Sequence, residues 1–445
     1  MERGTDSRGK RKLQEEEGDG YGALSLDELN QDLLERVLSR LPTSTFLSLT
    51  SVCKRWKSIS DSPTFKLACS EVPARDPWFL MVGPLPRPGK CIVFDSVGRN
   101  WKQLGRSPLL LSKLDSIPVA SSGGLVCFRG ARDGDLAVCN PLTGSAREIP
   151  RSDLPSDART LHAIVMRSRP LRDHSFDIIV VHGEFPKLFF KGFDSKLGTW
   201  GPDIALTRIS SVLNSDSLEA ESTSESVYFL SKAGDVVATD MLRSPSKQYS
   251  SVMIVEDGGE ILYFLSSSGT VVGCDLARGS FSEYPRLLPF CLEYSIDVME
   301  CRGEMVVAVL SEFLDTASLR IWRFDEECRS WAQMAAMPPS MSHEFYGKKM
   351  DINCVGLNDR VFRYILYDVA ANEWVELPQY RVNGVGLEFS SAFSFEPRIE
   401  ASVPRFDWLR KEQRGFQFLR AVFYVTCGWK SRISDLDHVQ IMSLE

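Results

Sequence analysis

The chain has 445 residues, enough for more than one domain, and its 43% hydrophobic and 25% charged residues are ordinary for a globular protein. Its net charge of −7 argues against non-specific binding to nucleic acid or to anionic membranes as the main activity. No apolar run reaches the roughly 18 residues of a membrane span, and the charged N-terminus lacks the apolar stretch of a secretion signal. The 11 cysteines show no C-x-x-C spacing, which favours reduced thiols in the cytosol or nucleus.

The first 25 residues are polar, rich in glycine and of mixed charge, a composition that predicts a disordered tail. Within it, Lys10, Arg11 and Lys12 match a weak nuclear-import signal, and a solvated charge cluster is the alternative.

Residues 26–70 predict a small domain of three short helices. Asn30 is suited to cap the first helix, and Pro42 ends it. The apolar residues at helical spacing are Leu33, Leu34, Val37, Leu38 and Leu41, then Phe46, Leu47 and Leu49, then Val52, Trp56 and Ile59. A block this small cannot bury its own apolar surface well, so it needs a partner inside the chain or outside it.

The sequence after Glu71 changes to short apolar runs separated by turn-forming residues, which predicts an all-β domain. A unit recurs at intervals of about 45 residues: an apolar strand ends in Asp or Asn, a polar turn follows, and an aromatic residue stands six positions later in five copies. The turn residues are Asp95, Asn140, Asp194, Asp240, Asp275, Asp325 and Asp368.

This period fits the four-stranded blade of a β-propeller. The Asp can bond its own backbone to make the turn, and the aromatic residue should fill the space between neighbouring blades. We expect six blades, with seven as the alternative, because the interval between Asp240 and Asp275 is short. The propeller is predicted over residues 71–397, with 393–397 as the strand that closes the ring. Residues 398–445 form a C-terminal extension that fits no further copy of the repeat; an appended helix and an atypical extension of the reading frame are the two alternatives.

No constellation of residues predicts catalysis or metal binding. The five histidines are far apart, and no nucleophile elbow or phosphate-binding loop occurs. We therefore expect no cofactor and no enzymatic activity. A basic loop at 166–175 contains Arg167, Arg169 and Arg172, and could recognise an acidic or phosphorylated segment if it lies on an open face. A solvated basic loop is the alternative.

The helical segment resembles an F-box, the domain that binds the Skp adaptor of cullin–RING ubiquitin ligases. The match includes Leu41-Pro42 and the run from Val52 to Trp56, whereas Asn30 stands where the family usually has a proline. The resemblance implies that the adaptor binds Leu29, Leu33, Leu34, Val37, Leu38, Leu41, Pro42, Val52, Cys53 and Trp56. Each position could instead belong to the core of a helical cap.

The repeats resemble divergent kelch motifs, with Gly123-Gly124 and Gly258-Gly259 matching the kelch diglycine. Plant F-box/kelch proteins look especially similar, because they share the pattern seen from Ser121 to Val126 and from Cys139 to Ser145. The expected fold is thus a multidomain α+β chain: a three-helix F-box followed by an all-β kelch-type propeller.

This resemblance implies a substrate-recognition subunit of an SCF-type (Skp–cullin–F-box) ubiquitin ligase, present in the cytoplasm, the nucleus or both. The propeller would bind a protein substrate, whose ubiquitination would lead to degradation by the proteasome. No direct contact with nucleic acid or membrane is expected. An F-box scaffold or transcriptional cofactor outside the ligase is the alternative, and a propeller enzyme is a weaker one.

Overall fold

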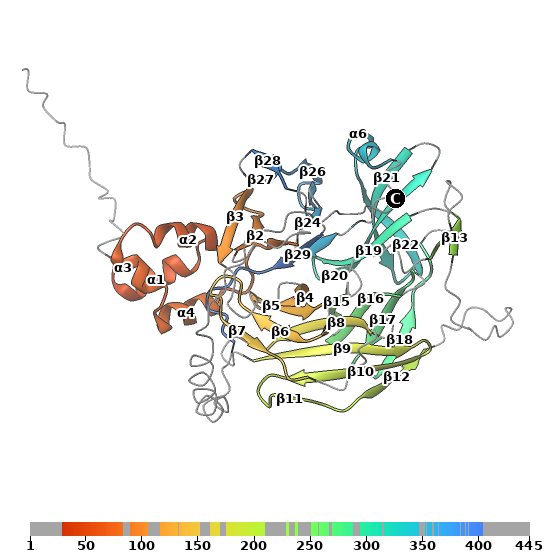
Figure 1. Ribbon diagram of the computed structural model, residues 1–445, viewed down its shortest axis with the longest axis horizontal. Helices are drawn as coiled ribbons and strands as arrows, with labels where there is room; N and C mark the ends of the chain where they lie inside the picture. Colours follow the sequence, from red (N-terminus) through yellow and green to blue (C-terminus); the bar gives the residue numbers. More distant parts are fainter. Residues whose placement is uncertain are drawn as a thin grey trace, which may run out of the picture.

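The computed structural model describes residues 29–82, 90–105, 116–131, 133–151, 161–169, 175–209, 228–230, 236–238, 251–256, 258–266, 269–287, 294–313, 316–346, 352, 354–357, 360–363, 365–382, 384–387, 389 and 391–403. They form a small helical domain and a large domain of β-sheets (Figure 1). Among these residues, no helix combines the length and the apolar character needed to cross a bilayer.

The helical domain has four short helices, one more than the sequence analysis counted. They are α1 (Gln31–Ser39), α2 (Thr43–Leu49), α3 (Lys54–Ile59) and α4 (Pro63–Ser70). Their common core consists of Leu34, Leu38, Phe46, Trp56, Ile59, Phe65 and Cys69. Helix α4 completes this core, because Phe65 stacks on Phe46 with 4.7 Å between ring centroids.

The helix caps differ in part from the expected ones. Asn30 precedes α1, but its side chain makes no capping hydrogen bond. Cys53 caps α3, since its sulfur accepts a hydrogen bond from the backbone N–H of Trp56. Ser62 caps α4 and Pro63 occupies the first helical position, where a missing N–H costs nothing.

Within the described residues the larger domain is a ring of six blades of four strands each, with a short additional strand, β11, paired to β10 in blade 3. Blade 1 combines β29 (Ser391–Phe395) with β1 (Trp78–Val82), β2 (Lys90–Asp95) and β3 (Asn100–Gly105); blade 2 contains β4 (Ser116–Ser122), β5 (Leu125–Gly130), β6 (Leu136–Cys139) and β7 (Ala146–Glu148); blade 3 contains β8 (Leu161–Ser168), β9 (Phe176–Glu184), β10 (Lys187–Asp194), β11 (Thr199–Trp200) and β12 (Ile204–Arg208). The remaining blades are blade 4 with β15 (Ser251–Glu256), β16 (Gly259–Leu265), β17 (Val271–Asp275) and β18 (Ser280–Glu283); blade 5 with β19 (Tyr294–Cys301), β20 (Glu304–Phe313), β21 (Thr316–Asp325) and β22 (Ser330–Ala336); and blade 6 with β23 (Val355–Leu357), β24 (Arg360–Arg363), β25 (Ile365–Asp368) and β26 (Glu373–Glu376).

Shorter elements lie between the blades. They are β13 (Tyr228–Leu230), which pairs with β14 (Val236–Ala238); α6 (Pro339–Ser342) and η3 (His343–Phe345); and β27 (Arg381–Val382), which pairs with β28 (Val385–Gly386). Strand β12 also pairs in parallel with β18, which joins the outer edges of blades 3 and 4.

The ring closes through the C-terminal strand. The first strands of the blades contact one another in the order β29, β4, β8, β15, β19 and β23, and β23 returns to β29. Strand β29 pairs antiparallel with β1, so the two ends of the propeller sequence share one blade. A C-terminal strand therefore closes the ring as predicted, although it spans Ser391–Phe395 and not 393–397, and the described residues form the six blades that we favoured. Asp240, which would have marked a seventh, lies outside the described residues.

The turns between third and fourth strands use the predicted Asp or Asn. In each of the six blades its side-chain oxygen accepts hydrogen bonds from backbone N–H groups two or three residues later, which makes a tight turn. The turn residues are Asp95, Asn140, Asp194, Asp275, Asp325 and Asp368.

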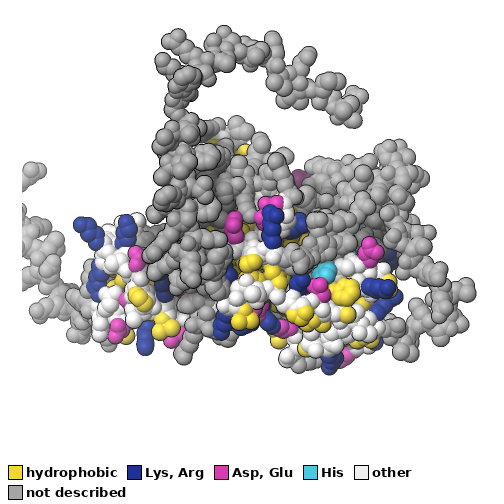
Figure 2. All heavy atoms as spheres, turned by 60° about the horizontal axis from the view of Figure 1, so that its bottom comes forward, with side chains coloured by type: hydrophobic (Ala, Val, Ile, Leu, Met, Phe, Trp, Pro, Cys, Tyr) yellow, Lys and Arg dark blue, Asp and Glu magenta, His cyan; other side chains and the backbone are white. Residues whose placement is uncertain are grey.

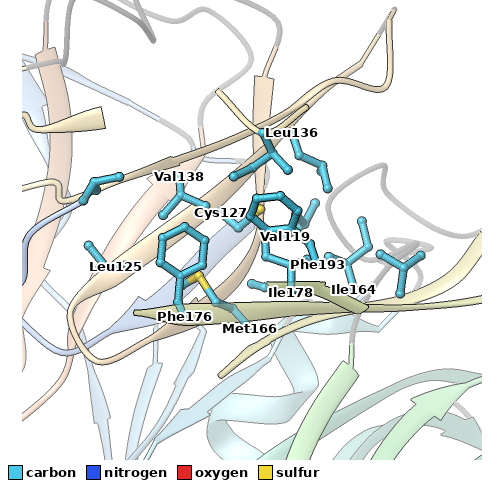
Figure 3. Close-up of a cluster of buried hydrophobic side chains, with 14 of the residues drawn as sticks. Val119, Leu125, Cys127, Leu136, Val138, Ile164, Met166, Phe176, Ile178 and Phe193 are labelled. Atoms are coloured by element: carbon cyan, nitrogen blue, oxygen red, sulfur yellow. The ribbon is translucent and has the colours of Figure 1, made fainter. Parts of the chain in front are cut away.

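The aromatic residue after the turn contacts the preceding blade, as predicted. The indole of Trp101 donates a hydrogen bond to the carbonyl of Pro378, Trp200 to Pro150, and Trp331 to Pro285, at 2.7–2.8 Å. The apolar faces of neighbouring blades also pack closely: Figure 3 shows Val138 and Leu136 of blade 2 facing Ile178 and Phe193 of blade 3.

The helical domain lies at one end of the propeller axis (Figure 1). Hydrogen bonds from Ser121 to Ser394 and between Ser122 and Ser168 bring the ends of β29, β4 and β8 together. Because Pro397, just after β29, accepts a hydrogen bond from Thr43 of α2, this end is the one that carries the helices. We call it the F-box face of the propeller, and the other end the opposite face.

Candidate functional site

The helical domain divides the ten predicted adaptor-binding residues into two groups. Leu33, Val37 and Val52 point away from the core, with exposed fractions of 53%, 44% and 68%. Pro42 is also exposed, and Leu29, Leu41 and Cys53 are half-buried. The remaining three, Leu34, Leu38 and Trp56, are buried core residues. The exposed members can contact a partner directly, whereas the buried ones support the helices that display them.

Leu33 and Val37 are one helical turn apart on α1, so they occupy the same face of that helix. The guanidinium of Arg55 on α3 donates to the carbonyl of Leu29 at 2.9 Å, which holds the start of α3 beside the start of α1. Val52 precedes α3 by two residues, and its side chain is exposed. We define the adaptor surface as Leu33, Val37 and Val52.

Two buried polar networks hold these helices. Glu35 accepts hydrogen bonds from Gln31 and from Ser62, the cap of α4, each at 2.9 Å. Burial of Glu35 opposes its ionisation, but hydrogen bonds from Thr64, Gln31 and Ser62 outweigh burial and lower its pKa. Arg75 donates to the carbonyls of Ser39 and Leu41 and so satisfies the C-terminal end of α1. These hydrogen bonds therefore fix the helices that carry the adaptor surface.

Several exposed basic side chains lie on or next to the helices that carry the adaptor surface. Arg36 on α1, Arg40 just after α1, and Lys54 and Lys57 on α3 are exposed. Figure 2 shows apolar side chains set among Lys, Arg, Asp and Glu side chains on the helical domain, at the left of the molecule. A partner for this surface should offer apolar contacts bordered by acidic groups.

The predicted basic loop does not form an open anion site in the described residues. Arg167 pairs with Asp177 at 2.8 Å and with Glu260, while Arg169 pairs with Asp177 and Asp194 at 2.8 and 2.9 Å. The described part of the loop begins at the end of β8, and Ser168 there bonds Ser122 at the F-box face. Arg172 lies outside the described residues. Carboxylates of blades 3 and 4 thus neutralise the two arginines that the structure shows, which argues against their part in substrate binding.

The described residues contain no cluster of His, Cys, Asp and Glu that could hold a metal ion. The thiols of Cys127 and Cys274 lie in the propeller core, and burial raises the pKa of each to about 12. Such thiols remain protonated at neutral pH and pack as small apolar groups.

The sequence analysis missed a segment near Arg398 that lies between the two domains and bonds the covalent linker after α4. Arg398 is 2% exposed and contacts the linker after α4, whereas the sequence analysis assigned it to an extension without predicted structure. A signal was present: Glu396, Arg398 and Glu400 alternate with period two, which places them on one side of an extended segment.

A helical domain with an exposed apolar surface, joined to a six-bladed propeller, is the arrangement of an F-box protein with a β-propeller. Comparisons with known proteins agree. The model of the F-box domain matches residues 26–68, and the model of the KIB1-4 beta-propeller matches residues 114–342.

F-box only protein 13 of Arabidopsis thaliana is 48% identical over 420 residues, which cover 89% of this chain and 91% of that protein. F-box only protein 6 of the same plant is 26% identical, covering 79% of this chain and 69% of the relative. An Arabidopsis thaliana F-box/kelch-repeat protein is 30% identical over 40% of this chain and 46% of its own length. The chain therefore belongs to the plant F-box proteins that carry a KIB1-4 beta-propeller.

Proposed function

We propose that this protein is the substrate-recognition subunit of an SCF-type ubiquitin ligase. Its adaptor surface would bind the Skp adaptor, and through it a cullin–RING ligase, while the propeller binds a protein substrate. Ubiquitination of that substrate would lead to its degradation by the proteasome. The observation that carries the proposal is the exposure of Leu33, Val37 and Val52 beside an otherwise well-packed helical core.

Exposed large apolar side chains that lie together on one small domain are typical of a protein–protein interface. The helical core already contains Leu34, Leu38 and Trp56, so the domain does not need the exposed side chains for its own stability. A partner that covers them gains apolar burial, and the surrounding Arg and Lys side chains favour an acidic partner.

The proposed role requires no nucleophile in this chain. A receptor accelerates ubiquitin transfer by holding the substrate near the thioester of a separate conjugating enzyme, which raises the effective concentration of the reacting groups. The F-box face carries the helical domain, so we propose that the substrate binds at the opposite face. We also propose that the propeller is of the kelch type. A cytoplasmic or nuclear location is proposed as well, because buried thiols such as Cys127 fit a reducing compartment.

The test compares two double variants of the full chain. Leu33→Asp with Val37→Asp places two carboxylates on the adaptor surface, and we expect the affinity for a recombinant plant Skp adaptor to fall about a hundredfold or more. Leu197→Asp with Val255→Asp is the matched control, because both side chains are exposed apolar residues of the propeller. The control should bind like the wild type.

Calorimetry measures the affinities, and thermal unfolding checks that both variants remain folded. Unchanged adaptor binding by the first variant would show that the adaptor surface is elsewhere. No binding by the wild type would favour an F-box scaffold or transcriptional cofactor outside the ligase. Leu38→Asp is unsuitable here, because Leu38 is a core residue and its substitution should unfold the helices.

A further inference from the structure

Residues 396–403 connect the helical domain to the propeller, and we call them the clamp segment. They follow β29, the strand that closes the ring, and run along the F-box face. The segment contributes side chains to both domains: Ile399 packs against the core of the helical domain, whereas Ala401 and Val403 join the core between blades 2 and 3.

Arg398 is the centre of the clamp segment. Its guanidinium donates to the carbonyls of Val72 at 3.0 Å and Pro73 at 2.9 Å, in the linker that follows α4. It also pairs with Glu396 at 2.5 Å and Glu400 at 3.0 Å. A single side chain, 2% exposed, therefore binds the linker and its own segment together.

The electrostatics keep this guanidinium charged. Burial lowers the pKa of Arg398, but the carboxylates of Glu396 and Glu400 outweigh burial, so the pKa lies above its ordinary value. A buried cation with four hydrogen-bonded acceptors is stable only while all of them stay in place. Movement of the linker would leave part of the charge unpaired.

Three contacts from other elements support the clamp segment. The hydroxyl of Thr43 on α2 donates to the carbonyl of Pro397 at 2.7 Å. The side-chain amide of Asn140 in blade 2 donates to the carbonyls of Arg398 and Ala401 at 2.8 and 2.7 Å. Gly124 of the same blade leaves room for the arginine, because a Cβ at this position would lie 2.5 Å from Cβ of Arg398.

We propose that Arg398 is a positioning residue that fixes the helical domain relative to the propeller, and so sets where a propeller-bound protein lies in the ligase. The part of the proposal that concerns the ligase rests on the proposed function. The part that concerns the domain orientation stands on the contacts alone.

The first test measures hydrogen exchange in the full-length protein. Arg398→Gln keeps most of the side-chain length but removes the charge and most donors. We expect amides in the clamp segment and in residues 66–76 to exchange about a hundredfold faster, since removal of one partner from a buried ion pair strongly favours local opening. Strands β20 and β21 of blade 5 should exchange as in the wild type.

A second pair of variants separates the clamp from general instability. Gly124→Ala pushes Arg398 out sterically and should give the same local increase in exchange. Gly303→Ala is its matched control: both glycines lie in the turn between first and second strands with φ values of +85° and +76°, but a Cβ at Gly303 meets no atom within 4 Å. The control should change exchange only near its own turn.

The last test reconstitutes the ligase and locates ubiquitin on the protein's own lysines by mass spectrometry. With the wild type, we expect modification at a restricted set of lysines. With Arg398→Gln, at equal adaptor affinity, we expect a broader distribution.

Wild-type exchange rates in Arg398→Gln, or faster exchange throughout the propeller, would overturn the proposal that Arg398 holds the two domains together. Identical lysine distributions would overturn the role of Arg398 in positioning the bound protein. A wild type that fails to bind the adaptor would refute the proposed function, and the exchange measurements alone would then test whether Arg398 fixes the domain orientation.

Discussion

At the scale of single residues, Asn140 shows why one repeat departs from the usual Asp. Its side-chain oxygen accepts from the N–H groups of Leu142 and Thr143, as the Asp does in other blades. Its amide nitrogen donates to the carbonyls of Arg398 and Ala401. A carboxylate could make the first set of bonds but not the second, because it has no donor when ionised.

Asn140→Asp should therefore destabilise the protein by about 3 kcal/mol or more, since a fully buried carboxylate would face two carbonyl oxygens. The reverse exchange at the equivalent position of blade 4, Asp275→Asn, keeps the turn acceptor and should change stability by less than about 1 kcal/mol. Urea unfolding of both variants measures the difference. Equal losses would show that the donors of Asn140 do not matter.

Asp194 links stability to pH. Partial burial opposes its ionisation, but the N–H groups of Leu197 and Lys196 and the guanidinium of Arg169 outweigh burial and hold its pKa below the ordinary value. Because the folded pKa lies below the unfolded value of about 3.9, the stabilisation is complete above that pH and disappears as the pH falls through the folded pKa. The stability advantage of the wild type over Asp194→Asn should shrink below about pH 4, as measured by urea unfolding from pH 2 to 7. A constant difference would contradict this assignment.

At the scale of elements, two kinds of hydrogen bond connect neighbouring blades. Among the described strands, none pairs with the axis-facing edge of the first strands, and serines bond part of that edge: Ser251 donates to the carbonyl of Ile164, and the N–H of Ser168 donates to Ser122. On the outside, indoles donate to a proline carbonyl of the preceding blade, as Trp331 does to Pro285. These prolines follow the fourth strands, where they end a strand and offer a free carbonyl.

Trp331→Phe should lower the free energy of unfolding by about 1 kcal/mol, because it removes the hydrogen bond to Pro285 while keeping most of the ring packing. Trp374→Phe is the comparison. Trp374 stacks on Tyr367 at 4.4 Å, and the described residues offer its indole no hydrogen-bond acceptor. Its substitution should cost less than that of Trp331. Chemical denaturation measures both, and a larger loss at Trp374 would contradict the role assigned to the indole bond.

At the scale of the whole molecule, the closing strand and the clamp segment are consecutive. Strand β29 pairs with β1 and completes blade 1, and the next residues fix the helical domain. Closure of the ring and orientation of the helices therefore depend on one short stretch of chain. A blade without its first strand would expose the apolar side chains of β1, including Phe79 and Leu80.

A series of shortened chains separates the two functions of this stretch. A chain that ends at Val403 keeps both, one that ends at Phe395 keeps the ring but lacks the clamp segment, and one that ends at Ser390 lacks both. We expect the first two to show a cooperative thermal transition of the propeller and the third to lose it. Calorimetry checks this, and a cooperative transition in the shortest chain would show that β29 is dispensable for ring closure.

The sequence by itself determined the elements and their repetition. Helical spacing identified the apolar residues of the helical domain, and the spacing of Asp and aromatic residues identified the blades, because local turn chemistry and side-chain periodicity are written in neighbouring residues. Only the tertiary structure separated exposed Leu33 and Val37 from buried Leu34 and Leu38, because packing against α4 and the clamp segment selects the face that is covered. It also showed that Asp177 and Asp194 of their own blade and the distant Glu260 neutralise Arg167 and Arg169. Arg398 joins the domains because its partners Val72 and Pro73 are distant in sequence and meet it only when the ring has closed.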